Sequence, residues 1–166
     1  MAGALIVTAE IAQRDFSWIE GLRRAHYPPE RNRVPAHLTV FHSLPPSAET
    51  ELRGRLARIV RRDAPVAAIE GLMDLGSGVA FRIVSPDLDG IRDELAAGLH
   101  GLLGAQDSGG WRPHVTIQNK VAPKVARALK RSIEQGFTPR SLAIAGLGLY
   151  RYLDGPWKRI GLYPFR

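Results

Sequence analysis

The 166-residue chain contains no cysteine. This absence excludes a disulfide framework, a thiolate nucleophile and cysteine-based zinc or iron–sulfur sites. Long apolar runs are missing too, since the longest, residues 142–150, is interrupted by glycines and a membrane span needs about 18 consecutive apolar residues. No basic segment precedes the first apolar run, so we expect a strand there rather than a signal peptide. A cytoplasmic protein without a membrane segment is the simplest expectation.

Acidic residues are the scarcer charged class, with 16 Asp and Glu against 23 Lys and Arg, which gives a net charge of +7. A basic surface favours phosphate-bearing ligands and speeds their arrival. The same excess is consistent with ordinary solubility, so charge alone does not identify a nucleic-acid binder. Hydrophobic residues at 45% and charged residues at 23% are typical of a globular chain and exclude a disordered or fibrous one.

Apolar periodicity and turn residues predict alternating strands and amphipathic helices. Strands are expected at 5–11, 36–44, 66–75, 78–84, 113–120, 141–153 and 157–164. Helices are expected at 15–26, 48–62, 88–102 and 123–135, with Ser47 and Asp87 as N-caps. The pair Asp154-Gly155 is a strong hairpin signal between the last two strands.

The two halves of the chain share a faint internal repeat. Pro35 and Pro113 shortly precede His37 and His114, and another proline, nine residues after each histidine, opens a helix with a basic outer face. The order strand, helix, strand, helix therefore recurs. We expect an α+β fold in which two related lobes of antiparallel sheet, with helices outside, form one domain over residues 1–166.

Residues 37–40 (His-Leu-Thr-Val) and 114–117 (His-Val-Thr-Ile) share the pattern His, apolar, Thr, apolar. Because side chains alternate faces along a strand, each histidine and its threonine point to one side, about 6.6 Å apart along the strand. If the two strands lie side by side, two imidazoles and two hydroxyls converge on one pocket.

Such a pocket suits in-line displacement at phosphorus. Because imidazole titrates near pH 6.5, one ring can take a proton from water while the other, protonated, gives one to a leaving oxygen. The hydroxyls of Thr39 and Thr116 can donate to the non-bridging oxygens. This chemistry needs no cofactor, and two histidines without a nearby carboxylate make a poor zinc site. We therefore expect His37 and His114 to be catalytic, with no metal.

The duplicated motif resembles the 2H phosphoesterase superfamily, and within it the RNA 2′,5′-ligase/2′,3′-cyclic phosphodiesterase family. The likeness covers nearly the whole chain, including the 77-residue spacing of the motifs and the contexts Pro-Ala-His-Leu-Thr-Val-Phe-His and Trp-Arg-Pro-His-Val-Thr-Ile. The family implies a bilobal, pseudo-two-fold fold with a central cleft, and metal-independent opening or formation of phosphodiester bonds. It implies a catalytic set of His37, Thr39, His114 and Thr116. For hydrolysis, the analogy makes His37 the acid and His114 the base.

We expect a cytoplasmic, monomeric phosphoesterase of this type, acting on the 2′,3′-cyclic phosphate or 2′,5′ linkage of an RNA end or nucleotide. Two alternatives stay open: a non-catalytic RNA-binding module of the same fold, and a phosphodiesterase for a small metabolite such as ADP-ribose cyclic phosphate. Many relatives carry an arginine shortly after the second histidine, where this chain has Asn119 and Lys120. We expect Lys120 to supply the positive charge there.

Aromatic side chains near the motifs could stack a nucleobase. Phe41, expected on the catalytic face of its strand, and Tyr152, near the final hairpin, are the candidates for the cleft. Core packing is the default expectation for aromatic residues here, including Tyr150 and Trp157. His42 is expected on the opposite strand face, in a structural role.

Overall fold

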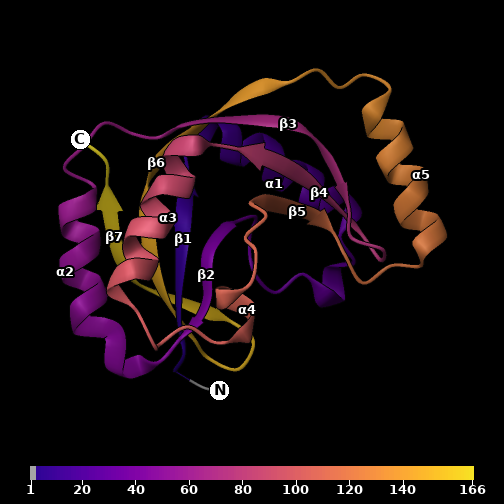
Figure 1. The fold of residues 1–166 in the computed structure, drawn as a ribbon. Coiled ribbons are helices and arrows are strands. Elements are labelled where there is room, and N and C mark those ends of the chain that lie inside the picture. Colours follow the sequence, from indigo (N-terminus) through magenta and orange to yellow (C-terminus); the bar gives the residue numbers. More distant parts are fainter. Residues whose placement is uncertain (1–2) are drawn as a thin grey trace.

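The computed structural model describes residues 3–166 as a mixed chain of helices and antiparallel strands (Figure 1). The strands are β1 (Leu5–Ile11), β2 (Leu38–Leu44), β3 (Val66–Asp74), β4 (Val79–Val84), β5 (His114–Gln118), β6 (Arg140–Tyr152) and β7 (Trp157–Pro164). The helices are α1 (Gln13–His26), α2 (Glu49–Ile59), α3 (Pro86–Gly98), α4 (Ala105–Ser108) and α5 (Pro123–Glu134), with short 3₁₀ helices η1 (Pro29–Arg31) and η2 (Pro46–Ala48). Within residues 3–166, none of the helices combines the length and apolar character needed to cross a lipid bilayer.

The long strand β6 joins two antiparallel sheets. Its first residues pair with β3, and its later residues pair with β1 and β7. On the side of β1, the sheet continues from β1 to β2. On the side of β3, it continues from β3 to β4 and then to β5. Within residues 3–166, β2 and β5 share one paired position, Leu38 with Val115. With this link the strand order is β1-β2-β5-β4-β3-β6-β7, and the added pairing of β1 with β6 closes a barrel of two lobes.

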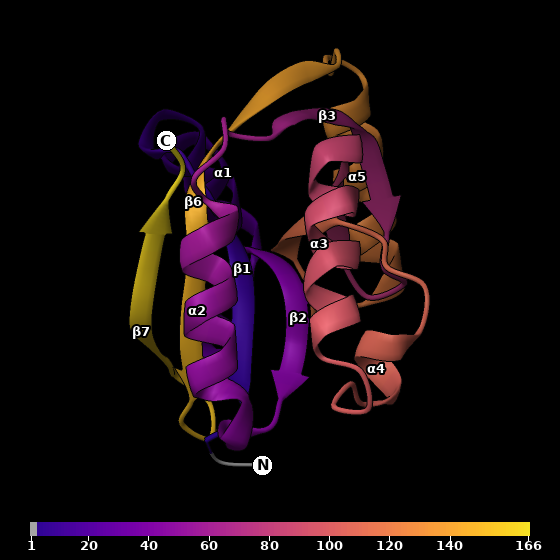
Figure 2. The same ribbon diagram turned by 60° about the vertical axis from the view of Figure 1, so that its left-hand side comes forward.

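The helices lie outside the two lobes (Figure 2). Helix α2 covers the lobe of β1, β2, β6 and β7, whereas α3 and α5 pack on the lobe of β3, β4 and β5. A proline and a helix follow each strand that carries a His-x-Thr motif. After β2, Pro46 opens the short helix η2, which leads into α2; after β5, Pro123 is the first residue of α5. The α+β, two-lobed fold expected from the sequence repeat is therefore confirmed.

A continuous apolar core fixes which way the motif side chains point. Leu52 of α2 and Leu88 of α3 are fully buried in it, as the periodicity of both helices predicts. Leu38 and Val115 are also fully buried in this core. Because side chains alternate along a strand, the histidine and threonine beside each of them face the other way.

Two helix N-caps differ from the sequence-based expectation. Helix α3 begins after Ser85, whose hydroxyl oxygen accepts a hydrogen bond from the Leu88 N–H at 3.0 Å. Asp87, expected as this cap, instead accepts from the backbone N–H of Val66 at 2.8 Å and so ties α3 to β3. Ser47, expected to cap α2, lies within η2 because the chain makes a 3₁₀ turn before the helix.

Truncating the buried leucine at the junction of the lobes should destabilise the protein. We expect Leu38→Ala to lower the free energy of unfolding by about 2–5 kcal/mol, since it leaves a cavity in the shared core. Urea denaturation followed by circular dichroism measures this loss. Leu162→Ala is the matched control, because Leu162 is 47% exposed and its truncation should change stability by no more than about 0.5 kcal/mol. Equal losses in both variants would contradict this account of the core.

Candidate active site

The junction of β2 and β5 brings the two motifs together on one face. The strands are antiparallel there, so His37 lies opposite Thr116, and Thr39 lies opposite His114. All four side chains are partly exposed, whereas the residues between them are buried. The two histidines are then diagonal neighbours, with α-carbons about 7–8 Å apart. This separation lets both imidazoles reach the same small group.

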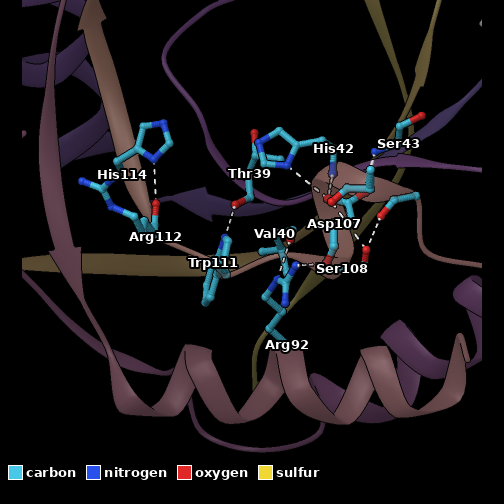
Figure 3. A network of polar contacts seen from close by, with 12 residues as sticks. Thr39, Val40, His42, Ser43, Arg92, Asp107, Ser108, Trp111, Arg112 and His114 are labelled. Carbon is cyan, nitrogen blue, oxygen red and sulfur yellow. Dashed lines mark hydrogen bonds and ion pairs between the residues drawn. The ribbon is translucent and has the colours of Figure 1, made fainter. Parts of the chain in front are cut away.

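The backbone holds the rings of His37 and His114 in the same way. His37 Nδ1 lies 2.8 Å from the carbonyl oxygen of Pro35, and His114 Nδ1 lies 2.7 Å from that of Arg112 (Figure 3 shows the second contact). A carbonyl oxygen can only accept, so Nδ1 carries the proton and donates it. In each neutral ring, Nε2 is therefore the unprotonated nitrogen. The repeat thus presents two equivalent Nε2 atoms.

The surroundings of His37 favour its neutral form. Burial lowers the pKa of His37 to about 4, although the hydrogen bond to Pro35 acts in the opposite direction. The positive charges of Arg23, His114 and His42 lower this pKa further. Because a ring with this pKa is neutral near pH 7, His37 is in the form that accepts a proton.

Two buried arginines brace the strands that carry the His-x-Thr motifs, and the sequence analysis missed both. Arg23 of α1 donates from Nη1 to the carbonyl of Thr116 at 2.9 Å, and from Nε to Asn32 at 2.9 Å. Arg92 of α3 donates from Nε to the carbonyl of Val40 at 3.1 Å. Burial lowers the pKa of Arg23. Each arginine therefore fixes the backbone of one motif-bearing strand from a helix.

The apolar stripes of these helices contain a signal that could have identified the arginines. In α3, Arg92 falls on the same stripe as Leu88, Ile91 and Leu95, which are all buried. An arginine on a core-facing stripe must find hydrogen-bond acceptors inside the protein. Its position predicts an internal partner, although the sequence does not say which strand supplies it.

A bulge in β2 changes the expected faces after the first motif. Thr39 pairs with Thr8, but Phe41 pairs with Val7, so Val40 is an extra residue. Phe41 consequently lies in the core with no exposed surface, under the guanidinium of Arg92. The expectation that Phe41 lines the cleft was wrong, because alternation does not continue through a bulge. For the same reason His42 is partly exposed, and Figure 3 shows it directed to the same side as Thr39 and His114.

A cavity of about 490 Å³ adjoins the histidine pair on the side of His37. Its lining includes Glu10, Arg33, His37, Tyr150, Trp157 and Arg159. The ring of Trp157 lies 4.6 Å from that of His37, centre to centre. Cavities of this size hold small organic ligands. The prediction that Tyr150 and Trp157 pack in the core was therefore wrong for both. The last hairpin places these two side chains in the cavity wall, beside the loop before His37.

Glu10 is fixed in the wall of this cavity by hydroxyl donors. Thr8 donates to Glu10 Oε2 at 2.7 Å, and the Tyr150 hydroxyl donates to Oε1 at 2.9 Å. Burial and the Glu10 carboxylate raise the pKa of Tyr150 to about 12, which keeps the phenol protonated. A β-carbon at Gly148 would lie 2.7 Å from Thr8 Oγ1 and 2.9 Å from Glu10 Cδ. The missing side chain at Gly148 therefore makes room for this network.

The two remaining candidates lie outside the cavity wall. Lys120 is exposed just after β5, with a positive φ of 64°. Tyr152 is partly buried and pairs with Trp157 where β6 and β7 meet. The hairpin itself is confirmed, and its turn residues Asp154 and Gly155 both have positive φ. Neither Lys120 nor Tyr152 is among the residues that line the cavity.

Within residues 3–166, no three histidine, aspartate or glutamate side chains are grouped closely enough to hold a metal ion. The carboxylate beside His42 belongs to Asp107, which makes a pair with that ring rather than a triad. The donor groups gathered around His37 and His114 are imidazole nitrogens and threonine hydroxyls. These groups can transfer protons and donate hydrogen bonds.

Comparison with known structures finds the same fold in several proteins. The TT0787 protein of Thermus thermophilus superposes with a TM-score of 0.68 at 16% identity, covering 98% of each chain. A protein described as a phosphoesterase gives 0.64 at 18% identity over 99% of each chain. LigT of E. coli, solved in complex with NADP+, gives 0.61 at 18% identity over 99% of each chain. At these identities the likeness establishes the fold alone.

Sequence comparison identifies the family. No curated protein matches the chain closely enough to count as a relative. The family model described as the 2′-5′ RNA ligase superfamily matches residues 9–156, a range that contains both His-x-Thr motifs and ends at the turn between β6 and β7. This chain therefore belongs to the 2′-5′ RNA ligase superfamily.

Proposed function

We propose that this chain is a phosphodiesterase that hydrolyses the 2′,3′-cyclic phosphate or 2′,5′ linkage of an RNA end or nucleotide, with His37 and His114 as its acid–base pair. The position of the two imidazoles carries the proposal. They are diagonal neighbours on adjoining strands, and each donates from Nδ1 to a carbonyl so that Nε2 is free. Such a pair can flank one phosphorus atom, and membership of the superfamily supports phosphodiester chemistry.

The proposed reaction moves one proton from each side of the phosphorus. Water attacks a 2′,3′-cyclic phosphate and loses a proton to one Nε2 atom, while the bond to the 3′ oxygen breaks and that oxygen takes a proton from the other ring. The products are a 2′-phosphate and a free 3′ hydroxyl. Thr39 and Thr116 donate from their hydroxyls to the non-bridging oxygens. Both proton transfers use side chains, so we propose a metal-independent reaction.

The low pKa of His37 sets the roles of the two rings in the free enzyme. A ring with a pKa of about 4 is neutral near pH 7, so it can accept the proton of the attacking water. We therefore assign His37 as the base and protonated His114 as the acid for the 3′ oxygen. This assignment reverses the one that the family resemblance suggested.

The cavity beside His37 supports a nucleotide as substrate. Trp157 offers an aromatic face for a base, and Arg33, Arg159 and Glu10 offer charged groups around it. Structures of E. coli LigT have been solved with 3′-AMP and with ATP, so a protein of this fold takes up nucleotides. The wall of this cavity includes His37 but not His114, so a nucleotide bound there would approach the pair from the side of His37.

Removing either imidazole should abolish most of the activity. We expect His37→Ala and His114→Ala each to lower kcat for a 2′,3′-cyclic nucleotide by about 10²–10⁴-fold, because each removes one positioned proton transfer. Assays in EDTA test the metal-independent mechanism at the same time. His100→Ala is the control, since His100 is exposed beyond α3. Full activity in either variant would contradict the assignment of that histidine to the acid–base pair, and loss of wild-type turnover in EDTA would contradict the metal-independent mechanism. A wild type without turnover on these substrates would favour the non-catalytic RNA-binding alternative.

The pH dependence should reveal the low pKa of His37. The base is neutral above its pKa, so kcat/KM should fall on the acid side only near pH 4. Arg23→Met should move this acid-side fall of kcat/KM (the acid limb) to higher pH, because it removes a positive charge that lowers the pKa of His37. Arg127→Met, at an exposed position on α5, should leave the limb in place. A limb near pH 6.5 in the wild type would contradict the assignment of His37.

The threonine hydroxyls should contribute to turnover without supporting the fold. We expect Thr39→Val and Thr116→Val each to lower kcat/KM by about 10–100-fold, the effect of losing a hydrogen bond to a charged group. Thermal unfolding should change little, because valine has nearly the same shape. Thr50→Val, on the exposed face of α2, serves as the control. Unchanged kinetics in both motif variants would exclude phosphate positioning by these hydroxyls.

A further inference from the structure

A third histidine lies on the catalytic face and is held by a buried acid. His42 Nδ1 is 3.1 Å from Asp107 Oδ1, and Asp107 is only 1% exposed. The same carboxylate accepts the backbone N–H groups of His42 at 2.8 Å and Ser43 at 2.9 Å. Burial acts to raise the pKa of Asp107, but these hydrogen bonds together lower it below its usual value. Asp107 is therefore a carboxylate that accepts the proton of Nδ1.

Arg92 supports this pair from below (Figure 3). Its Nη2 donates to the carbonyl of Asp107 at 2.7 Å, and its Nε donates to the carbonyl of Val40 at the bulge of β2. Its formal charge offsets that of Asp107, so the cluster is neutral while His42 is neutral and carries +1 when the ring is protonated. The protonated cluster is thus suited to an anion.

The orientation of His42 leaves one nitrogen for a ligand. Because Nδ1 faces Asp107, Nε2 is the free nitrogen, and the side chain remains 33% exposed. The two backbone N–H groups would hold Asp107 in place without any imidazole, so the Nδ1 contact serves to orient the ring. The bulge that turns His42 outward also keeps it on the face of Thr39. His42 is close enough to the catalytic pair for its charge to lower the pKa of His37.

His42 is separate from both parts of the site already described. It does not line the cavity beside His37. It follows Thr39 by three residues along β2, which corresponds to about 10 Å or less, given that a bulge shortens the path. This offset is too long for the phosphorus between His37 and His114, and suits a neighbouring group of the same substrate.

We propose that His42, oriented by Asp107, binds a second phosphate of the substrate, one that is not cleaved. The proposal rests on the proposed function, because it names the substrate class of that site: nucleotides or RNA ends that carry a phosphate beside the reacting one. When the ring is protonated, Nε2–H donates to a phosphate oxygen. His42 then contributes to KM, whereas the proton transfers belong to His37 and His114.

Three substrates with the same reacting group test the proposal. A nucleoside 2′,3′-cyclic phosphate has one phosphate, its 5′-phosphorylated form has two, and a dinucleotide ending in the cyclic phosphate has an internal phosphodiester. We expect the wild type to prefer a two-phosphate substrate in kcat/KM by about 10–100-fold, the value of a hydrogen bond between charged groups. Preference for the 5′-phosphorylated form would point to a small nucleotide, and preference for the dinucleotide alone would point to an RNA end; either supports the proposal.

His42→Ala should remove most of this preference through a higher KM for the two-phosphate substrate. His42→Gln, which keeps a donor, should retain part of it. The control His100→Ala should keep the full preference. Equal kinetics of the wild type on one and two phosphates, or an equal loss on all three substrates in His42→Ala, would overturn the proposal. Neither result contradicts the proposed function, because in both the wild type still hydrolyses the cyclic phosphate. Hydrolysis of none of the three substrates would instead contradict the proposed cyclic phosphodiesterase activity itself.

Discussion

At the junction of β2 and β5, Leu38 and Val115 pair across a seam that has no second paired position within residues 3–166. Their burial in the common core turns both His-x-Thr faces outward together. Arg23 and Arg92 add rigid links from two helices to the same two strands. A single apolar pair, reinforced by two buried guanidinium groups, thus sets the spacing of residues that are distant in sequence.

The electrostatics of the site follow from where the charges lie. No carboxylate forms a hydrogen bond with the ring of His37 or His114 in the part of the chain described, residues 3–166, and each ring donates to a neutral carbonyl. Burial and nearby cations then favour the neutral form of His37. His42 is different, because a buried carboxylate contacts its ring. Three imidazoles within one site therefore have different environments and are suited to different tasks.

The repeated motif was sufficient to predict the fold class, the pairing of the two strands and the facing of His37, Thr39, His114 and Thr116. Local chemistry also predicted the turn at Asp154-Gly155. The prediction failed for Phe41 because the bulge at Val40 arises from the register between β2 and β1, which a single strand does not encode. Partners such as Asp107 could not be predicted either, since α4 reaches β2 only through tertiary packing.

The near-symmetry of the two motifs has a consequence for substrate polarity. A phosphodiester placed between the two motifs would meet an imidazole and a hydroxyl from either direction. The motifs alone would therefore accept the substrate in both orientations. The wall of the cavity includes His37 but not His114, so the surroundings of the two motifs differ. Under the proposed function, the loop before β2 and the last hairpin would therefore select which ester oxygen departs. Changes in these peripheral segments could then alter the regiochemistry of the proposed reaction while both His-x-Thr motifs stay the same.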